Sequence, residues 1–460
     1  MGTPRRFSFR DQSATVYRKD SSVFRFISRD YEPTYKHLME SGLYAELVRQ
    51  ELLVEHEETT TPNFVRDLDN CARVIKPVRI PFVSYPYEWS FSQLQDAALV
   101  TLKVQKLALQ YGMTLKDANA WNVQFCGGKP VFIDTSSFEI YKPGRPWGAY
   151  GQFCRFFLMP LVLMARREIR LNRLLLIYPD GIPLDLGVSL LPWTVWTDLS
   201  LSAHLLATAV SHGFYKSSGK KSDSGISISG SALPNIIEHL EDTVAGLRLK
   251  DKNSVWSDYY KDNTYSDKAS TSKQKIVEDV LQASERKMVW DLGANTGVYS
   301  RIAARHAKHV LSMDYDALCV ERNYQALKKE PSTNILPLLM DCASPSPAIG
   351  WALSERLSLP DRGPCDMLLA LALIHHLAVG NSIDFEQVAD YFAAMAREVL
   401  VEFVPREDEQ VVRLMKQRTN YCLTYTRENF EKAFLRNFKL VACHQVEDSN
   451  RTLYHFERLS

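Results

Sequence analysis

The sequence predicts an α/β protein in which a Rossmann-like parallel sheet follows a separate α+β domain. The first observation is an apolar run, 288–290, that ends in Asp291 and a glycine-spaced turn before a helical pattern. The second is another apolar run that ends in Asp314, 21 residues beyond Gly293. The third is a tract of mainly Gly, Ser and Lys, 217–231, which is typical of a linker between two such parts.

The composition is that of a globular protein. The 460 residues suffice for two or three domains, and hydrophobic and charged contents of 45% and 24% lie in the usual range. A net charge of +1 creates no overall field that would attract nucleic acid or an anionic membrane. Eight scattered cysteines without a Cys-x-x-Cys pair favour reduced thiols and a cytoplasmic location. Neither a signal peptide nor a transmembrane segment is expected.

The first domain is expected over 1–215. A β-hairpin is predicted within 7–29 from its alternating pattern. The clearest element is a long amphipathic helix over 91–111, for which either Ser90 or Ser92 provides the N-terminal cap.

A set of polar residues follows that helix. Asp117 is followed by Asn122 five residues later, and a short apolar run ends in Asp134. In kinases an Asp at the first of these places accepts the hydroxyl proton, while the Asn and the second Asp hold Mg²⁺. The stretch resembles the catalytic and metal-binding loops of protein and aminoglycoside kinases. This resemblance implies a kinase-like fold over 1–215.

Two departures argue against phosphoryl transfer by this domain. The first 80 residues contain only two glycines, so the glycine-rich loop that covers ATP phosphates is missing. In addition, Leu115-Lys116 and Thr135-Ser136 replace the usual neighbours of the two aspartates. We expect a kinase-like binding or scaffold domain without phosphotransferase activity and predict no metal site. An ATP-dependent phosphotransferase or nucleotide-binding module is the alternative function. Whether Asp117, Asn122 and Asp134 bind ATP or metal stays open.

The segment 216–275 is expected to hold the linker and lid helices. Aromatic residues are concentrated between Trp256 and Tyr265, before a helix that is expected over 270–283 and precedes the first strand of the sheet. They could cover a cofactor, and packing of one helix on the sheet is an equally good alternative.

The turn after Asp291 differs from the dinucleotide fingerprint, because the spacing G-x-G-x-x-G is absent. Asp-Leu-Gly-Ala-Asn-Thr-Gly, 291–297, resembles the first motif of class I S-adenosylmethionine (SAM) methyltransferases. The resemblance covers 276–460 and implies a Rossmann-like seven-stranded methyltransferase sheet that ends in a helix and a hairpin, 438–446 and 452–458. It also implies that the acid-x-glycine turn faces the amino acid part of SAM.

Further cofactor contacts follow from the strand ends. Asp314 is suited to accepting hydrogen bonds from both ribose hydroxyls. Asp341 ends the third strand, where the resemblance implies a contact with the adenine amine. The candidate SAM-binding residues are Asp291, Gly293, Asn295, Gly297, Asp314 and Asp341.

Two histidines are the catalytic candidates. A fourth strand, expected over 365–373, runs into His375 and His376, and ligands collect at the carboxyl ends of such strands. Either histidine could orient a substrate or accept its proton near neutral pH. A helix cap and a ring stacked on SAM are the alternatives, and the sequence does not separate the two residues.

The whole chain is also similar to a group of bacterial two-part proteins with a SAM methyltransferase half, including nodulation proteins of the NoeA type. The similarity is carried by 8–11, 84–90, 291–297 and 375–377. It implies a SAM-dependent methyltransferase. The methyl acceptor, for which a small molecule or glycan is favoured, and the oligomeric state stay open.

Overall fold

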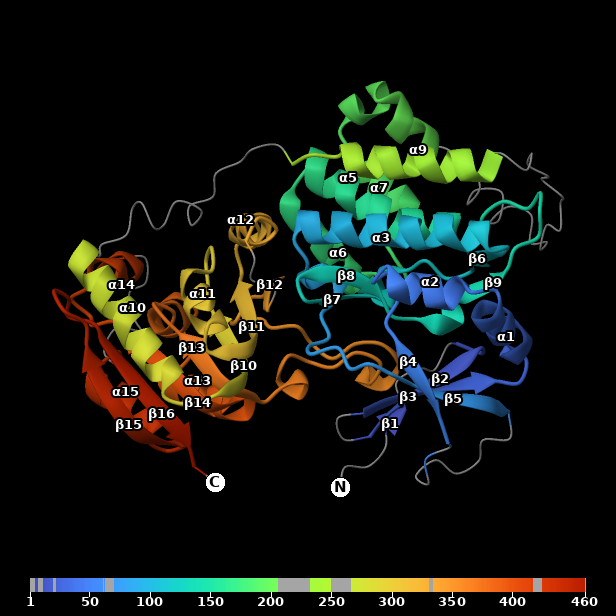
Figure 1. Cartoon of the computed structure of the whole chain (residues 1–460). Helices are drawn as coiled ribbons and strands as arrows, with labels where there is room; N and C mark the ends of the chain where they lie inside the picture. The colour runs from blue at the N-terminus through green and yellow to red at the C-terminus, as the bar shows by residue number, and fades with distance from the viewer. Residues whose placement is uncertain are drawn as a thin grey trace. The chain divides into compact units, whose positions relative to one another are not determined.

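The protein is described by a computed structural model of two compact units. The described residues are 5–6, 11–19, 22–60, 62, 70–205, 232–249, 266–330, 334–416 and 424–459. The expected linker tract and the aromatic segment Trp256–Tyr265 lie outside them. Unit 1 comprises Met1–Asp251 with Ile349–Arg356, and unit 2 comprises Lys252–Ala348 with Leu357–Ser460. Figure 1 labels their helices and strands.

Unit 1 begins with an antiparallel sheet of order β1-β2-β3-β5-β4. Its strands are β1 Arg5–Arg6, β2 Ala14–Lys19, β3 Ser22–Ser28, β4 His56–Thr59 and β5 Cys71–Pro77. β2 and β3 form the predicted hairpin. Helices α1 (Glu32–Glu40) and α2 (Leu43–Arg49) lie between β3 and β4 in the chain.

The predicted long helix is α3, Phe91–Gln110. Ser90 is its cap: the Ser90 hydroxyl accepts a hydrogen bond from the Gln93 amide, and the Gln93 side chain accepts one from the Ser90 amide. This reciprocal pair is a capping box, which satisfies two amides at the helix start. Helix α9, Ala232–Gly246, lies beside α3 (Figure 1), where Lys106 pairs with Glu241. Thus α9, from the expected linker and lid segment, belongs to unit 1.

Short strands follow α3. They are β6 Met113–Leu115, β7 Val123–Cys126, β8 Lys129–Phe132 and β9 Phe138–Ile140, and they pair as β6 with β9 and β7 with β8. The rest of unit 1 is mainly helical, with α4 Tyr150–Phe153, α5 Met159–Arg166, α6 Leu174–Ile177 and α7 Leu184–Leu190. Among the helices of the described residues, none has the length and apolar character that a membrane span requires.

Unit 2 is built on a seven-stranded sheet of order β12-β11-β10-β13-β14-β16-β15. The strands are β10 Arg286–Leu292, β11 Ala307–Asp314, β12 Ile335–Leu339, β13 Cys365–Ala370, β14 Ala396–Phe403, β15 Phe438–Gln445 and β16 Thr452–Arg458. The first five are parallel, and β16 runs antiparallel to both its neighbours. The predicted sheet with its terminal hairpin is therefore present.

Six helices accompany this sheet in the described part of unit 2: α10 Asp267–Gln282, α11 Val298–Ala304, α12 Ala317–Leu327, α13 Phe385–Met395, α14 Glu409–Met415 and α15 Arg427–Phe434. Val289, Val310 and Leu400 of the strands share one buried apolar cluster with Val277 and Leu281 of α10. The chain passes from β10 to β11 and β12 on one side and then crosses to β13 on the other. Such a reversal opens a crevice at the carboxyl ends of the central strands.

Candidate functional site

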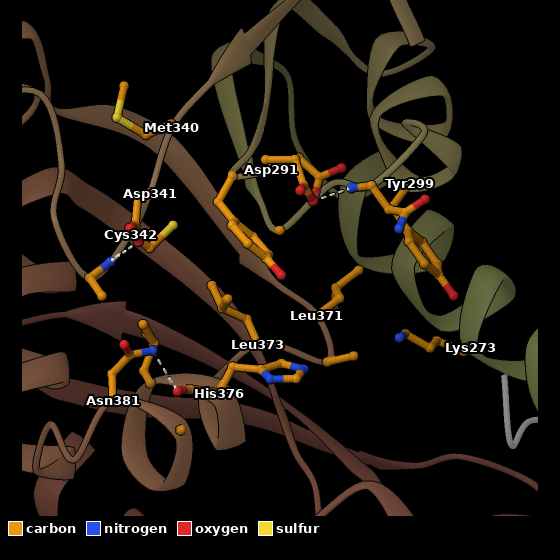
Figure 2. A pocket seen from close by; sticks show the side chains of 18 of the residues that line it. Lys273, Asp291, Tyr299, Met340, Asp341, Cys342, Leu371, Leu373, His376 and Asn381 are labelled. Atoms are coloured by element: carbon orange, nitrogen blue, oxygen red, sulfur yellow. Dashed lines mark hydrogen bonds between the residues drawn. The ribbon is translucent and has the colours of Figure 1, made fainter. Parts of the chain in front are cut away.

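A pocket of about 330 Å³ lies in that crevice. Figure 2 shows the residues that line it, with Met340, Asp341 and Cys342 on one side and Lys273 and Tyr299 on the other. The lining residues come from α10 and α11, from the carboxyl ends of β10 and β11, and from the segments that follow the parallel strands β10, β11, β12 and β13. Five of the six candidate SAM-binding residues line the pocket: Asp291, Gly293, Asn295, Asp314 and Asp341.

The turn after β10 depends on left-handed backbone. Gly293 has φ of 72° and Asn295 has φ of 51°, in a backbone region that residues other than Gly, Asn and Asp rarely adopt. The Gly293 amide donates to the Met313 carbonyl, and the Asn295 amide donates to the Asp314 carboxylate at 2.7 Å. These bonds fix the turn against the end of β11, so the first two predicted strand ends face one pocket.

Gly297 has another position. It does not line the pocket but forms the N-cap of α11 with φ of 83°. A Cβ atom there would lie 2.6 Å from the side-chain oxygen and nitrogen of Asn323. Glycine is therefore required at 297 by packing and backbone conformation.

Two of the carboxylates are buried. Asp291 is 1% exposed and accepts a hydrogen bond from the Ser300 hydroxyl at 2.6 Å. Burial raises the pKa of Asp291 to about 6, although that bond and the charge of Lys273 oppose the shift. Burial likewise raises the pKa of Asp314 to about 6, against hydrogen bonds from the amides of Asp316 and Asn295. Both groups titrate just below neutral pH in the free protein.

The end of β12 contributes a third acid. Asp341 is half-buried, and its carboxylate accepts a hydrogen bond from the Ala343 amide at 2.9 Å. Burial raises the pKa of the adjacent Cys342 thiol well above its usual range, so this thiol stays protonated at neutral pH.

The two adjacent histidines differ in their position relative to the pocket. His376 lines the pocket, whereas His375 is 1% exposed and does not. Their ring centroids are 4.2 Å apart. Burial lowers the pKa of His376 to about 4 and that of His375 well below its ordinary value. Both rings are therefore neutral at pH 7, and His376 is the one that can meet a ligand.

The predicted fourth strand is shorter than expected. It ends at Ala370 rather than at Leu373. Ala372 has φ of 51°, and its amide donates to the Glu402 carboxylate at 2.7 Å instead of extending the sheet. The freed residues Leu371, Ala372 and Leu373 line the pocket.

Sequence reasoning did not identify Lys273. This residue of α10 lines the pocket and is 2% exposed. Its ammonium lies 2.6 Å from the carboxylate of Glu402 and 4.8 Å from the ring centre of Tyr299. A lysine in an amphipathic helix ordinarily faces water, and only the tertiary structure brings it to Glu402, which is distant in the sequence.

Two of the three polar residues that the sequence singles out in unit 1, Asn122 and Asp134, are connected by hydrogen bonds. Asn122 donates to the Ser137 hydroxyl at 3.0 Å, which in turn donates to Asp134 at 2.8 Å. Asp117 instead accepts a hydrogen bond from the Asn119 side chain at 2.6 Å. Asn122 and Asp134 are thus joined through one serine, while Asp117 has a different partner.

Asp134 also has a cationic partner. The Arg25 guanidinium from β3 forms an ion pair with the Asp134 carboxylate, and both side chains are 12% exposed. The amide and hydroxyl of Ser136 donate to the same carboxylate at 2.8 and 2.6 Å. Within the described ranges, no group of three His, Cys, Asp or Glu side chains is arranged to hold a metal ion.

Unit 2 is thus an α/β domain with the seven-stranded sheet and terminal hairpin that the resemblance to class I methyltransferases predicts, and with a pocket at the carboxyl edge of its parallel strands. Over 457 residues the chain is 32% identical to the nodulation protein NoeA of Rhizobium meliloti (strain 1021), a match that covers 98% of this chain and 95% of that protein. The chain therefore belongs to the NoeA family. No family model matches it.

Among solved structures, the chain is similar to the N-methyltransferase NodS from Bradyrhizobium japonicum WM9, with 12% identity, a TM-score of 0.32, and coverage of 42% of this chain and 99% of that chain. It is also similar to magnesium protoporphyrin IX methyltransferase (ChlM) from Synechocystis PCC 6803 with bound SAH, with 14% identity, a TM-score of 0.33, and coverage of 44% and 92%. Both likenesses are remote.

Proposed function

We propose that this protein is a SAM-dependent methyltransferase and that the pocket of unit 2 binds the cofactor. The observation that carries the proposal is the convergence of acids from three strand ends, Asp291, Asp314 and Asp341, beside Gly293 in one pocket. SAM presents an ammonium, a sulfonium, two ribose hydroxyls and an adenine amine. These groups are cationic or donate hydrogen bonds, and carboxylates are their strongest acceptors.

Each acid has a proposed role. Asp314 accepts hydrogen bonds from the ribose hydroxyls, and Asp341 accepts one from the adenine amine. Gly293, with Asp291 beneath it, lets the amino acid part pass close to the backbone. Asn295 holds the turn through the bond between its amide and Asp314. Gly297 contributes indirectly, because it shapes the start of α11.

When bound, SAM supplies an electrophilic methyl group on its sulfonium. The protein then contributes alignment of the acceptor and exclusion of water. Neutral His376 can accept a hydrogen bond from an acceptor hydroxyl or amine. A base with a pKa of about 4 retains a proton poorly at pH 7, so this arrangement favours orientation of the acceptor over storage of its proton. A small molecule or glycan is the proposed acceptor class.

We infer that unit 1 is a kinase-like domain that does not transfer phosphoryl groups. The kinase-like fold is supported by an antiparallel sheet, a long helix and the short strands β6 to β9 that follow it. Asp117 and Asn122 lie between β6 and β7, and Asp134 lies just after β8. The pairing of Asp134 with Arg25 opposes metal binding. For this reason the phosphotransferase alternative is not proposed.

Calorimetry with S-adenosylhomocysteine (SAH) and, separately, with Mg-ATP tests both assignments. We expect the unmodified protein to bind SAH and to give no heat with Mg-ATP. Absence of SAH binding would remove the basis for the methyltransferase proposal. Turnover of ATP that is lost in Asp117→Ala would restore the phosphotransferase.

Asp314→Ala is expected to weaken SAH binding by about 1.5–3 kcal/mol, the usual contribution of a hydrogen bond to a charged group. The matched control is Asp279→Ala, which removes an exposed acid from α10 outside the pocket lining. Calorimetry should give parent-like affinity for the control alone. Equal affinities of the two variants would refute the ribose assignment.

Binding of SAH is expected to weaken as the pH falls through about 6. Ionised Asp314 is required to accept the ribose hydrogen bonds, so each pH unit below its pKa costs up to about tenfold in affinity. The stability of the protein without ligand changes with pH in the opposite direction. The pKa of Asp314 in the folded protein lies above its unfolded value of about 3.9, so its protonation as the pH falls from about 6 to 4 favours the folded state. Calorimetry from about pH 5 to 8, beside unfolding curves without ligand, separates the two effects.

A further inference from the structure

Lys273 is a charged side chain in the wall of the pocket. It extends from α10 with its nitrogen directed toward the pocket (Figure 2), and its side chain is only 3% exposed. Burying an ammonium is unfavourable unless partners compensate its charge. The burial of the Lys273 ammonium in the pocket wall therefore requires partners that compensate its charge.

Glu402, at the end of β14, fixes the position of this ammonium. Its side chain has no exposed surface and contacts both the Lys273 ammonium, at 2.6 Å, and the Ala372 amide, at 2.7 Å. The guanidinium of Arg451 lies 3.6 Å from the other Glu402 oxygen and also pairs with Asp408 at 2.7 Å. Glu402 thus connects α10, the loop after β13 and the residue that precedes β16, and its charge is shared by a second cation, Arg451.

The geometry of an ammonium lets Lys273 serve more than one partner. It carries three N–H donors that point in different directions, and the Glu402 carboxylate lies on one side of it. The Tyr299 ring, 4.8 Å away, adds a favourable face for a cation without using an acceptor oxygen. An anionic ligand group beside Lys273 would therefore meet a fixed cation in a site largely screened from water.

The charges of the pocket are ordered. Figure 2 shows Lys273 and Tyr299 on one side of the pocket and Asp341 on the other, while Asp314 ends the intervening strand β11. The acid Asp291 also lines the pocket, close enough to Lys273 for their charges to interact. A matching ligand therefore carries an anion and a cation together at one end and hydrogen-bond donors at the other. The SAM amino acid part has one anionic group, its carboxylate.

We propose that Lys273 binds the carboxylate of SAM, with Glu402 as the positioning residue that holds the ammonium in the pocket wall. This inference rests on the proposed function, since it assumes that the cofactor occupies the pocket. It makes Lys273 a determinant of specificity for SAM and SAH over analogues that lack the carboxylate. A lysine that only neutralised Glu402 would give no such discrimination.

The first test uses the unmodified protein. Calorimetry compares SAH with decarboxylated SAH, which differs only in the missing carboxylate. We expect the analogue to bind about 10- to 150-fold more weakly, the range for a hydrogen bond to a charged group. Equal affinity would overturn the inference while leaving the proposed function intact. Binding of neither compound would overturn both.

The second test assigns the discrimination to Lys273. Lys273→Met alone would leave Glu402 buried without its nearest cation, so the variant of choice is Lys273→Met with Glu402→Gln. We expect this double variant to bind SAH and decarboxylated SAH within about threefold of each other, since the charged hydrogen bond is gone. The control is Lys268→Met on the same helix, a 70% exposed lysine, which should keep the parent ratio. Parent-like discrimination in the double variant would overturn the assignment. If the double variant does not fold, the ratio of the affinities for SAH and decarboxylated SAH is measured instead on the single variant Lys273→Gln.

Discussion

Gly293→Arg is expected to abolish detectable binding of SAM and SAH while leaving unit 1 folded. Gly293 lines the pocket with φ of 72°, and a Cβ atom there would already lie 3.4 Å from the Leu373 side chain. An arginine at this place has to extend into the space proposed for the amino acid part of SAM. Calorimetry measures the loss, and circular dichroism shows whether the fold persists.

The matched control for this variant is Gly112→Arg. Gly112 has nearly the same φ, 71°, but a Cβ atom there would meet nothing within 4 Å, and it lies in unit 1. Both variants bear the same backbone strain of about 1–2 kcal/mol, so only the obstructed pocket differs. Undiminished affinity of Gly293→Arg for SAH would show that the first motif has been assigned wrongly.

The fold of unit 2 could be predicted because its signals are local. Buried parallel strands are continuous apolar runs, and acids or glycines mark where they end. The last strand, Thr452–Arg458, has the predicted bounds. The fourth strand was predicted three residues too long, since Leu371, Ala372 and Leu373 continue the apolar run. Their departure from the sheet depends on Glu402, which is distant in the sequence.

The site could be predicted only in part. Acids at strand ends are visible in a sequence, because chain order and the parallel arrangement place them at one edge. The sequence does not show which of two adjacent histidines faces the pocket, since that depends on the rotation of one helical turn. Nor does it distinguish Gly293, beside the pocket, from Gly297, beside Asn323. Lys273 was missed because its burial depends on tertiary contacts alone.

Arg25→Met is the variant with the largest expected effect on unit 1. Arg25 and Asp134 are far apart in the sequence, each 12% exposed, and joined by an ion pair. Removal of one partner leaves the Asp134 carboxylate buried without its cation, which ordinarily costs about 3–5 kcal/mol. We expect faster hydrogen exchange in β3 and in the peptide that contains β8 and Asp134, with unit 2 peptides unchanged.

A second variant separates charge from packing. Arg25→Met combined with Asp134→Asn removes both charges, while the oxygen of the new carboxamide can still accept from the Ser136 amide, so the double variant should recover much of the lost protection. Arg49→Met, which breaks an exposed pair with Glu46, is the control and should leave exchange unchanged. Parent-like exchange in Arg25→Met would contradict the buried pairing. Asp134 would then again be a candidate metal ligand, because its carboxylate would be stable without the Arg25 guanidinium that now pairs with it.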